Sequence, residues 1–379
     1  MAYPTGYSRY QEVTIDKDEV DADLTDFPVY VDLSDLVKVG DDLFDTCRSD
    51  GGDIRITKSD GTTELPREVV AIDTSAKTGE LHFKYTGTLS STIDTVIRIY
   101  YNGTDTEPAI DATYGAENVW NSNYKAVYHL KNTSGGELDS TSNDNDLSDN
   151  ETVGSAVGKL GNARDFEHDN GEFLNITDNA SLDFNNADFT ISLWVNPETA
   201  RDWGGITKAT AFNETKANYY LTFNTGLGGM LLGVGNGSSR DCINVGTITT
   251  GTWKHYVGRF TASSGELAIF ENTTKNSKTT AINPASNAGD FNLGAFAGSA
   301  QLDGKMDEVR IVAAALADNW ISTEYSNQNA PSTFYATGDE EGTPSGPANL
   351  KSINGLAKAS IKSRNSLAIG SIKSINGLS

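Results

Sequence analysis

The clearest pattern of hydrophobic and polar positions lies in residues 189–195, which read FTISLWV. Apolar side chains occupy every second position, and this period of two is typical of a strand with one buried face. Asn196-Pro197 ends the strand, because proline cannot donate a hydrogen bond to a neighbouring strand. A second short strand is predicted at residues 172–176. The pattern indicates a sheet protein that carries its function in its loops.

The first part of the chain repeats this alternation in short segments. Residues 27–33 (FPVYVDL) and 95–101 (TVIRIYY) alternate, and Asp60-Gly61 and Asn102-Gly103 are turn signals. Further short strands are predicted nearby, which gives about six to eight strands in roughly 100 residues. This density of strands predicts a β-sandwich.

Four segments of this first region carry a resemblance to a known family: DLTDFPVYVDL, GGDIRIT, DGTTELPREV and DTVIRIYYNG. They resemble the N-terminal β-domain of unknown function that precedes laminin-G-like modules in bacterial surface and phage proteins. The resemblance covers most of residues 5–115. It implies a β-domain that accompanies the next domain in the chain, and it indicates no activity.

A second resemblance covers most of residues 118–338 and rests on six segments in order: NVWNSNYKAVYHL, DSTSNDND, GKLGNARDF, FTISLWVNP, TWKHYVGRFTASSGELAIFEN and LDGKMDEVRI. They resemble laminin-G-like, concanavalin A-type jelly rolls. One short helix is predicted, at residues 313–322. We therefore expect an all-β fold class with two tandem β-sandwich domains, at 1–115 and 116–338, of which the second is a concanavalin A-like jelly roll.

The composition changes at the C-terminus, where residues 339–348 form a predicted Gly/Pro/Ser linker and residues 349–379 a basic repeat with a period of 11. We expect three small hairpins or strand turns, too few to fold alone, that attach the chain to a partner or trimerise it. The alternative is a disordered tail. The repeat units resemble the C-terminal tails of tailed-phage structural proteins. The residues expected to make these assembly contacts are Lys351, Ile353, Lys362, Lys373 and Ile375.

The net charge of −23 narrows the choice of partners. Such a chain repels phosphate backbones, so we expect no nucleic acid partner. No apolar stretch reaches the roughly 18 residues of a membrane span, so we expect no membrane partner. Cys47 and Cys242 fall in different predicted domains, which argues against a disulfide framework. The first residues lack a basic start and an apolar stretch, and we expect that a secretion signal was removed or that the protein leaves its cell by another route.

The sequence shows no recognisable arrangement of catalytic residues, which predicts a protein without enzymatic activity. Concanavalin A-type glycosidases place two carboxylates about 5 Å apart on one strand. Alternation along a strand would put Asp307 and Glu308 on opposite faces, where they cannot work as a pair. The four histidines, His82, His129, His168 and His255, are scattered along the sequence, and we interpret His255 as a structural strand residue. No Gly-x-Ser-x-Gly nucleophile motif occurs.

The turn at residues 139–146 offers oxygen ligands at alternate positions, the set that a hard cation such as Ca²⁺ needs. It lacks the glycine and the distal glutamate of an EF-hand loop. The resemblance to laminin-G-like domains implies one calcium near the rim of the sandwich, between this turn and Asp307. The expected ligands are therefore Asp139, Asn143 and Asp307, and the alternative is that these side chains only cap turns.

The loop at residues 198–220 exposes Trp203 beside two glycines, with Tyr219 and Tyr220 following. An exposed aromatic ring can stack on the apolar face of a sugar. We expect Trp203, Tyr219 and Tyr220 to bind a ligand, and the alternative is that Trp203 anchors the loop. We expect core packing for three of the other tryptophans, Trp194, Trp253 and Trp320.

Together these features predict a non-enzymatic virion surface structural protein: a decoration, head-fibre or tail-fibre subunit that presents the laminin-G-like domain for adhesion to host-surface glycans. Its tail would contact virion or other assembly proteins, or a further copy of the chain in a homo-oligomer. The alternative is a secreted bacterial adhesin or a carbohydrate-binding module of a larger surface protein, on the cell surface or outside the cell. A polysaccharide hydrolase, the third hypothesis, would need a carboxylate pair.

Overall fold

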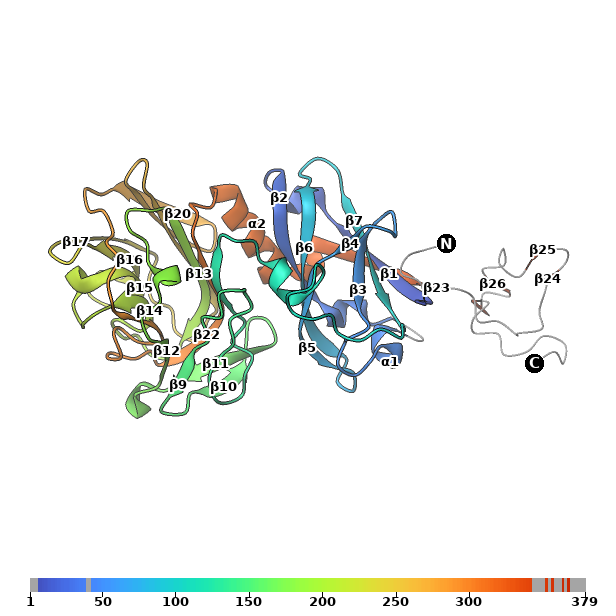
Figure 1. Ribbon diagram of the computed structural model, residues 1–379, viewed down its shortest axis with the longest axis horizontal. Coiled ribbons are helices and arrows are strands. Elements are labelled where there is room, and N and C mark those ends of the chain that lie inside the picture. Colours follow the sequence, from blue (N-terminus) through green and yellow to red (C-terminus); the bar gives the residue numbers. More distant parts are fainter. Residues whose placement is uncertain are drawn as a thin grey trace.

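Two β-sandwiches lie side by side in the computed structural model, with helix α2 (Asp318–Asn329) packed between them (Figure 1). The structure describes residues 6–38 and 42–342, and four two-residue strands beyond them, at 352–353, 356–357, 363–364 and 367–368. The predicted all-β fold class is confirmed. Within the described residues no helix is both long and apolar enough to cross a membrane.

The first sandwich consists of two antiparallel sheets that enclose their own apolar core. The five-stranded sheet has the order β23 (Tyr335–Gly342), β1 (Arg9–Ile15), β7 (Thr95–Tyr101), β3 (Arg55–Lys58) and β4 (Glu64–Leu65). The three-stranded sheet has the order β2 (Leu24–Asp32), β6 (Thr78–Leu89) and β5 (Arg67–Asp73).

The last strand of the first sandwich comes from the far end of the described chain. Strand β23 pairs antiparallel with β1 along its whole length, with Ile15 opposite Tyr335 and Arg9 opposite Gly342 (Figure 1). The expected second domain extends to 338 and the expected linker begins at 339, whereas residues 335–342 form a strand of the first sandwich. Phe334 and Tyr335 are buried in the core of the first sandwich, which explains why the chain returns there.

The second sandwich has a larger pair of sheets around a second core. The eight-stranded sheet runs in the order β10 (Gly154–Val157), β11 (Asn162–Phe166), β22 (Gly304–Val312), β13 (Phe189–Pro197), β18 (Lys254–Thr261), β19 (Glu266–Glu271) and β20 (Thr274–Thr279), and β8 (Tyr124–Tyr128) pairs with β22. The seven-stranded sheet runs in the order β17 (Arg240–Val245), β16 (Gly229–Gly235), β15 (Ala217–Asn224), β14 (Gly205–Ala209), β21 (Asp290–Leu293), β12 (Phe173–Ile176) and β9 (Ser148–Asn150).

Strand β13 shows why the two sandwiches stay together. Its apolar residues point into the core between the two sheets, as the alternation predicts. Its other face is buried as well: Trp194, for which core packing was expected, packs on Tyr325 of α2 and donates a hydrogen bond of 2.6 Å to Gln328. The outer face of the eight-stranded sheet is therefore the interface with α2 and the first sandwich.

Helix α2 begins five residues later than predicted and ends seven residues later, at Asn329. Its sequence, DNWISTEYSNQN, is mostly polar, because several of the side chains it buries are polar interface groups such as Glu324 and Asn327. A search for apolar periodicity misses such a helix. Of the three tryptophans predicted to be core residues, only Trp194 is fully buried, while Trp253 and Trp320 are partly exposed.

The remaining regular elements are short. The helices are α1 (Leu43–Thr46) and α3 (Pro331–Phe334), and the 3-10 turns are η1 (Lys17–Glu19), η2 (Leu33–Leu36), η3 (Ala116–Val119), η4 (His168–Asn170), η5 (Ala180–Leu182) and η6 (Glu214–Lys216). In the tail, β24 (Ser352–Ile353) pairs with β25 (Leu356–Ala357), and β26 (Ser363–Arg364) with β27 (Leu367–Ala368). Of the predicted assembly residues, Ile353 lies in β24, and Lys351, Lys362, Lys373 and Ile375 lie outside the described residues.

Candidate functional site

An aromatic pocket opens among the loops of the seven-stranded sheet, with a cavity of about 190 Å³. Trp203 precedes β14, a loop and η6 connect β14 to β15, and Phe296 follows β21, so the lining comes from segments far apart in the sequence. The residues that line the pocket are Trp203, Phe212, Asn213, Glu214 and Phe296.

The three aromatic rings of the pocket hold one another in edge-to-face contacts. The ring centres of Trp203 and Phe296 lie 5.5 Å apart at an interplanar angle of 86°, and those of Phe212 and Phe296 lie 5.5 Å apart at 89°. Phe296 is buried, whereas Phe212 is 53% exposed. An exposed phenyl ring on a fixed aromatic base offers a flat apolar face to a ligand.

The backbone around Trp203 is constrained. Trp203 has a φ of 74°, a conformation that bulky residues rarely adopt, and its amide donates a hydrogen bond of 2.8 Å to the carbonyl of Phe223. Gly204 passes so close to Leu302 that a Cβ would lie 2.6 Å from the Cα of that residue. Trp203 is therefore held at the pocket by the surrounding chain, and such strain is common at ligand sites.

The polar part of the pocket comes from η6. Glu214 accepts a hydrogen bond of 3.1 Å from the Tyr220 hydroxyl and pairs with the Arg240 guanidinium at 2.7 Å. The side-chain oxygen of Asn213 accepts from the backbone amide of Thr215 at 2.9 Å. These contacts fix an amide and a carboxylate beside the aromatic rings, where they can meet the hydroxyl groups of a ligand.

The structure separates the three residues that the sequence predicted as ligand contacts. Trp203 lines the pocket, but Tyr219 and Tyr220 are both 0% exposed. Tyr219 packs between the sheets against Phe189, and Tyr220 lies behind the pocket, 5.7 Å from Phe296 between ring centres. Tyr219 thus belongs to the core, and Tyr220 supports the pocket without lining it.

Sequence reasoning missed Phe212, Glu214 and Phe296 as pocket residues. The two phenylalanines are far apart in the sequence, and only the pairing of β14 with β21 brings their loops together. The one available signal was a phenylalanine within the polar run Thr210–Lys216, where an apolar side chain has no strand to join.

The predicted calcium ligands have other partners in the structure. The carboxylate of Asp139 accepts hydrogen bonds from the amides of Val127, Thr141 and Asn145 and from the Thr141 hydroxyl, at 2.9 to 3.0 Å. Asn143 donates to the Tyr124 carbonyl at 3.1 Å. These contacts match the turn-capping alternative.

Asp307, the third predicted ligand, is fully buried, and its Oδ2 atom accepts from the amides of Lys159 and Leu160, both at 2.8 Å. It thereby fixes the turn between β10 and β11. Calcium binding by Asp139, Asn143 and Asp307 stays a prediction that rests on the resemblance.

A β-bulge in β22 changes the direction of two side chains. Strand β13 advances two residues, from Ser192 to Trp194, where β22 advances three, from Arg310 to Asp307. Glu308 is the extra residue, with a φ of 48°. Met306 and Val309, which flank the Asp307-Glu308 pair, both point into the core. Asp307 and Glu308 therefore both face outward, and the prediction that they lie on opposite faces was wrong.

Next to the bulge, two of the histidines that are scattered in the sequence meet at the interface between the sandwiches. The rings of His82, on β6, and His129, after β8, lie 4.7 Å apart between centres. His129 Nδ1 contacts Glu308, and its Nε2 lies 3.4 Å from Glu68 on β5. Glu80 lies beside both rings, 3.3 Å from His82 Nε2.

The pKa values of this cluster follow from burial and from the mutual contacts. Burial opposes the charge on His129, but Glu308 and Glu68 outweigh it, so the pKa of His129 lies well above its usual value. Burial also opposes the ionisation of Glu68, but His129 and two hydrogen-bond donors bring the pKa of Glu68 to about 2. Burial lowers the pKa of His82 to about 3, and burial together with Glu308 raises the pKa of Glu80.

A second arm of the network reaches helix α2. The Arg310 guanidinium binds Glu308 at 2.8 Å and Glu324 of α2 at 2.9 Å. Glu324 also lies 3.4 Å from His255 Nε2. The prediction that His255 has a structural role agrees with this position. Three of the four histidines that are scattered along the sequence, His82, His129 and His255, therefore lie in one network.

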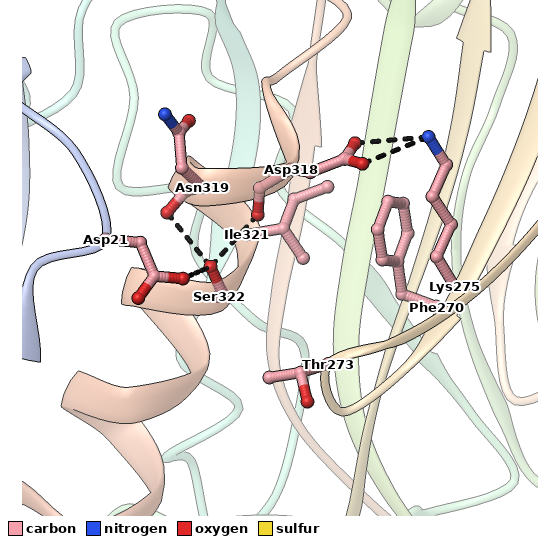
Figure 2. A pocket seen from close by; sticks show the side chains of 8 residues that line it. All are labelled: Asp21, Phe270, Thr273, Lys275, Asp318, Asn319, Ile321 and Ser322. Atoms are coloured by element: carbon pink, nitrogen blue, oxygen red, sulfur yellow. Dashed lines mark hydrogen bonds and ion pairs between the residues drawn. The ribbon is translucent and has the colours of Figure 1, made fainter.

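A second cleft lies between α2 and the β19–β20 hairpin, with a cavity of about 430 Å³ (Figure 2). Asp318 at the start of α2 pairs with Lys275 at 3.1 Å, and Ser322 hydrogen-bonds to Asp21 of the first sandwich. Lys275 and Asp318 pair with each other and Asp21 accepts from Ser322, so the charged side chains of this cleft already have partners. Its lining has a single aromatic ring, that of Phe270. The aromatic pocket is therefore the stronger candidate for a ligand site.

Comparison with known proteins agrees with the fold of the second sandwich. Residues 169–322 match the family model described as the concanavalin A-like lectin/glucanases superfamily. No curated protein matches the chain.

Several solved structures are similar at low identity. The binding domain of Paraclostridial Mosquitocidal Protein 1 is 13% identical, with 54% of this chain and 52% of that chain covered and a TM-score of 0.43. Domain 4 of AbnA, an extracellular arabinanase from Geobacillus stearothermophilus, in complex with arabinotriose, is 21% identical, with 54% and 98% covered and a TM-score of 0.42.

The binding domain of botulinum neurotoxin serotype D is 10% identical, with 54% and 52% covered and a TM-score of 0.44. The chain thus spans about half the length of the mosquitocidal and neurotoxin structures. The resemblances stated for residues 5–115 and for the tail stay predictions. The residues that match the concanavalin A-like family model, 169–322, lie mostly in the second sandwich, whose first strand, β8, begins at Tyr124.

Proposed function

We propose that this protein is a non-enzymatic carbohydrate-binding surface protein that holds a neutral sugar ring in the pocket of Trp203, Phe212 and Phe296. The single observation that carries the proposal is this pocket: fixed aromatic rings beside a positioned amide and carboxylate, on the loops of a concanavalin A-like domain. Stacking on an aromatic face combined with a few fixed polar groups is how concave sites select polar ligands with an apolar face.

The size of the cavity and the net charge of the protein narrow the class of glycan that we expect to bind. A cavity of about 190 Å³ is smaller than the roughly 300 Å³ at which ordinary ligand pockets begin, so it suits one ring of a longer glycan. The net charge of −23 repels sulfated or sialylated chains. We therefore expect neutral glycans to bind best.

Binding fits the pocket better than hydrolysis does. Glycosidases of this type use two carboxylates about 5 to 9.5 Å apart. Of the five lining residues only Glu214 has a carboxylate, and that group is engaged by Arg240 and Tyr220. A binding protein needs no such pair.

The experiment is a glycan array with the full chain, followed by calorimetric titration of the best glycan against matched variants. Phe212→Ala removes the exposed ring and should weaken binding about tenfold. Leu227→Ala, on the turn between β15 and β16, removes a side chain of similar exposure outside the pocket and should bind like the wild type. The proposal fails if no glycan on the array binds, or if Phe212→Ala retains full affinity.

The setting we propose is the surface of a virion, with the basic repeat tail attaching or oligomerising the protein. The supporting observation is that the first two repeats each contain a short antiparallel strand pair, β24–β25 and β26–β27. Solution masses of the full chain and of a chain that ends at Gly342, together with probing of native particles, test this setting. If both chains are monomers and the protein occurs free or on cell surfaces, the adhesin alternative replaces it.

A further inference from the structure

Four side chains meet between the two sandwiches in an arrangement that the sugar pocket does not use. Glu80 and His82 come from β6, His129 follows β8, and Glu308 is the bulge residue of β22. Each offers one ligand atom, and these atoms all lie within 4.8 Å of one another. All four residues are buried.

The distances between these atoms approach those of a tetrahedral site. A metal with bonds of roughly 2.0 to 2.2 Å to nitrogen and oxygen has ligand atoms roughly 3.3 to 3.6 Å apart. His82 Nε2 lies 3.3 Å from Glu80 Oε1 and 3.9 Å from Glu308 Oε2. His129 Nδ1 lies 3.6 Å from Glu80 Oε1 and contacts Glu308 directly. To admit an ion, the His129–Glu308 contact would have to widen and the 3.9 Å distance from His82 to Glu308 would have to shorten slightly.

Polar side chains outside the cluster orient two of the four proposed ligands, His129 and Glu308. His129 Nε2 faces Glu68 at 3.4 Å, and Glu68 in turn accepts from Trp120 Nε1 at 2.9 Å and from the Ser140 hydroxyl at 2.6 Å. Glu308 Oε2 accepts from Arg310 at 2.8 Å. A carboxylate behind a histidine ligand is a recurrent feature of metal centres, because it fixes the ring and its tautomer.

Three buried atoms of the cluster form no hydrogen bond among the described residues: Glu80 Oε2, His82 Nδ1 and His129 Nε2. His129 Nε2 still faces the Glu68 carboxylate at 3.4 Å. A buried polar atom without a hydrogen bond is destabilising, so several in one cluster indicate that something further belongs there. Glu80 and Glu308 also bring two carboxyl groups together, and a cation would neutralise their repulsion.

We propose that Glu80, His82, His129 and Glu308 bind one divalent transition-metal ion at the domain interface. Two imidazoles and two carboxylates suit Zn²⁺, which favours four ligands in a tetrahedron, whereas Ca²⁺ needs six to eight oxygen atoms. All four positions come from the protein, as in structural zinc sites, so the ion joins the sandwiches and leaves no place for a substrate. None of these four residues is among the predicted calcium ligands, Asp139, Asn143 and Asp307, which form hydrogen bonds with other groups.

The test uses the full chain, stripped by dialysis against a chelator and then incubated with ZnCl₂. Elemental analysis after gel filtration should give one Zn²⁺ per chain, and the apparent melting temperature should rise with Zn²⁺. Cobalt(II) chloride provides a readout that needs no variant: tetrahedral coordination by these ligands should give strong visible absorption bands. Bound Zn²⁺ well below one per chain, or only the weak bands of octahedral Co²⁺, would overturn the proposal.

Variants distinguish zinc bound at this site from zinc bound elsewhere on the protein. Glu80→Gln and His82→Gln should each abolish stoichiometric Zn²⁺ binding, while His255→Gln, a buried interface histidine outside the cluster, should keep it. A second acidic group, Asp165, Glu167 and Glu198, is partly exposed and could hold ions loosely. If Glu167→Gln with Glu198→Gln removes the bound zinc and Glu80→Gln does not, the interface site is refuted.

Discussion

Asn327 of helix α2 hydrogen-bonds to both backbone groups of Tyr30 on strand β2. Its Oδ1 atom accepts from the Tyr30 amide at 2.7 Å, and its Nδ2 group donates to the Tyr30 carbonyl at 2.9 Å. Since β2 is an edge strand of its sheet, the helix supplies the pairing that a further strand would give. The next residue, Gln328, binds Trp194 of the second sandwich, so adjacent side chains of one helix hold both domains.

Asn327→Ala should therefore destabilise the protein strongly. The substitution leaves a buried amide and a buried carbonyl of Tyr30 unpaired, which costs about 2 to 5 kcal/mol for the two groups. Urea denaturation measures the loss. Asn329→Ala is the matched control, because Asn329 is exposed on the same helix, and its effect should stay within about 0.5 kcal/mol. Equal effects of the two variants would show that the Tyr30 contact does not stabilise the interface.

Phe334→Ala should unfold the first sandwich preferentially, although Phe334 is distant in sequence from most of that domain. Its side chain is fully buried in that core, and truncating a buried phenylalanine costs about 3 to 5 kcal/mol. Hydrogen exchange should accelerate in β1 and β7 more than in β13 and β18. Thr333→Ala, at an exposed neighbouring position, should leave exchange unchanged. A uniform change in both sandwiches would contradict the assignment of Phe334 to the first.

Gly233→Ala should damage the aromatic pocket from behind. A Cβ at this position of β16 would lie 1.9 Å from Cζ of Tyr220, whose ring supports Phe296. The forced shift should cost about 1 to 3 kcal/mol and weaken glycan binding in the same variant. Gly226→Ala, in an exposed turn where the nearest atom is 3.4 Å from a Cβ, is the control for both measurements. Unchanged binding by a folded Gly233→Ala protein would show that Tyr220 does not position the pocket.

Cys47 should resist alkylation at pH 8. Burial, reinforced by the charge of Asp53, raises the pKa of its thiol to about 12. The thiolate is the reactive form and becomes abundant only as the pH approaches that value, so labelling by iodoacetamide should be slow at pH 8 and should speed up as the pH rises. Mass spectrometry of the labelled peptide, with the urea-unfolded chain as reference, measures the protection. Equal labelling rates in the folded and unfolded chains would contradict the prediction.

The sequence predicted the features that depend on local alternation. Residues 189–195 lie in β13, which continues through the Asn196-Pro197 pair that was predicted to end it, and the all-β class follows from many such segments. The alternation could not show what covers the outer face of β13, because the covering residues belong to α2 and the first sandwich. The bounds of α2 could not be predicted from its polar sequence for the same reason. Glu324, Asn327 and Gln328 are buried because they pair with groups distant in sequence, and such pairs leave no periodic pattern of apolar residues.

The candidate sites depend even more on long-range contacts. Trp203 was found because a tryptophan beside two glycines is conspicuous, but Phe212 and Phe296 meet only after β14 pairs with β21. The cluster of His82, His129 and Glu308 needs two domains and a bulge to form. The bulge shows in the sequence of β22 only as a spacing of three between the core residues Met306 and Val309, and it reverses the direction of Glu308.

The pairing of β1 with β23 also sets the order of events during synthesis. Strand β1 leaves the ribosome early, but its outer partner follows β7 by about 230 residues. At translation speeds of roughly 5 to 20 residues per second, the first sandwich waits roughly 10 to 50 s with one edge of β1 open. The second sandwich, which is inserted between β7 and β23, has all its strands before then and can close first, so the first sandwich completes its fold last.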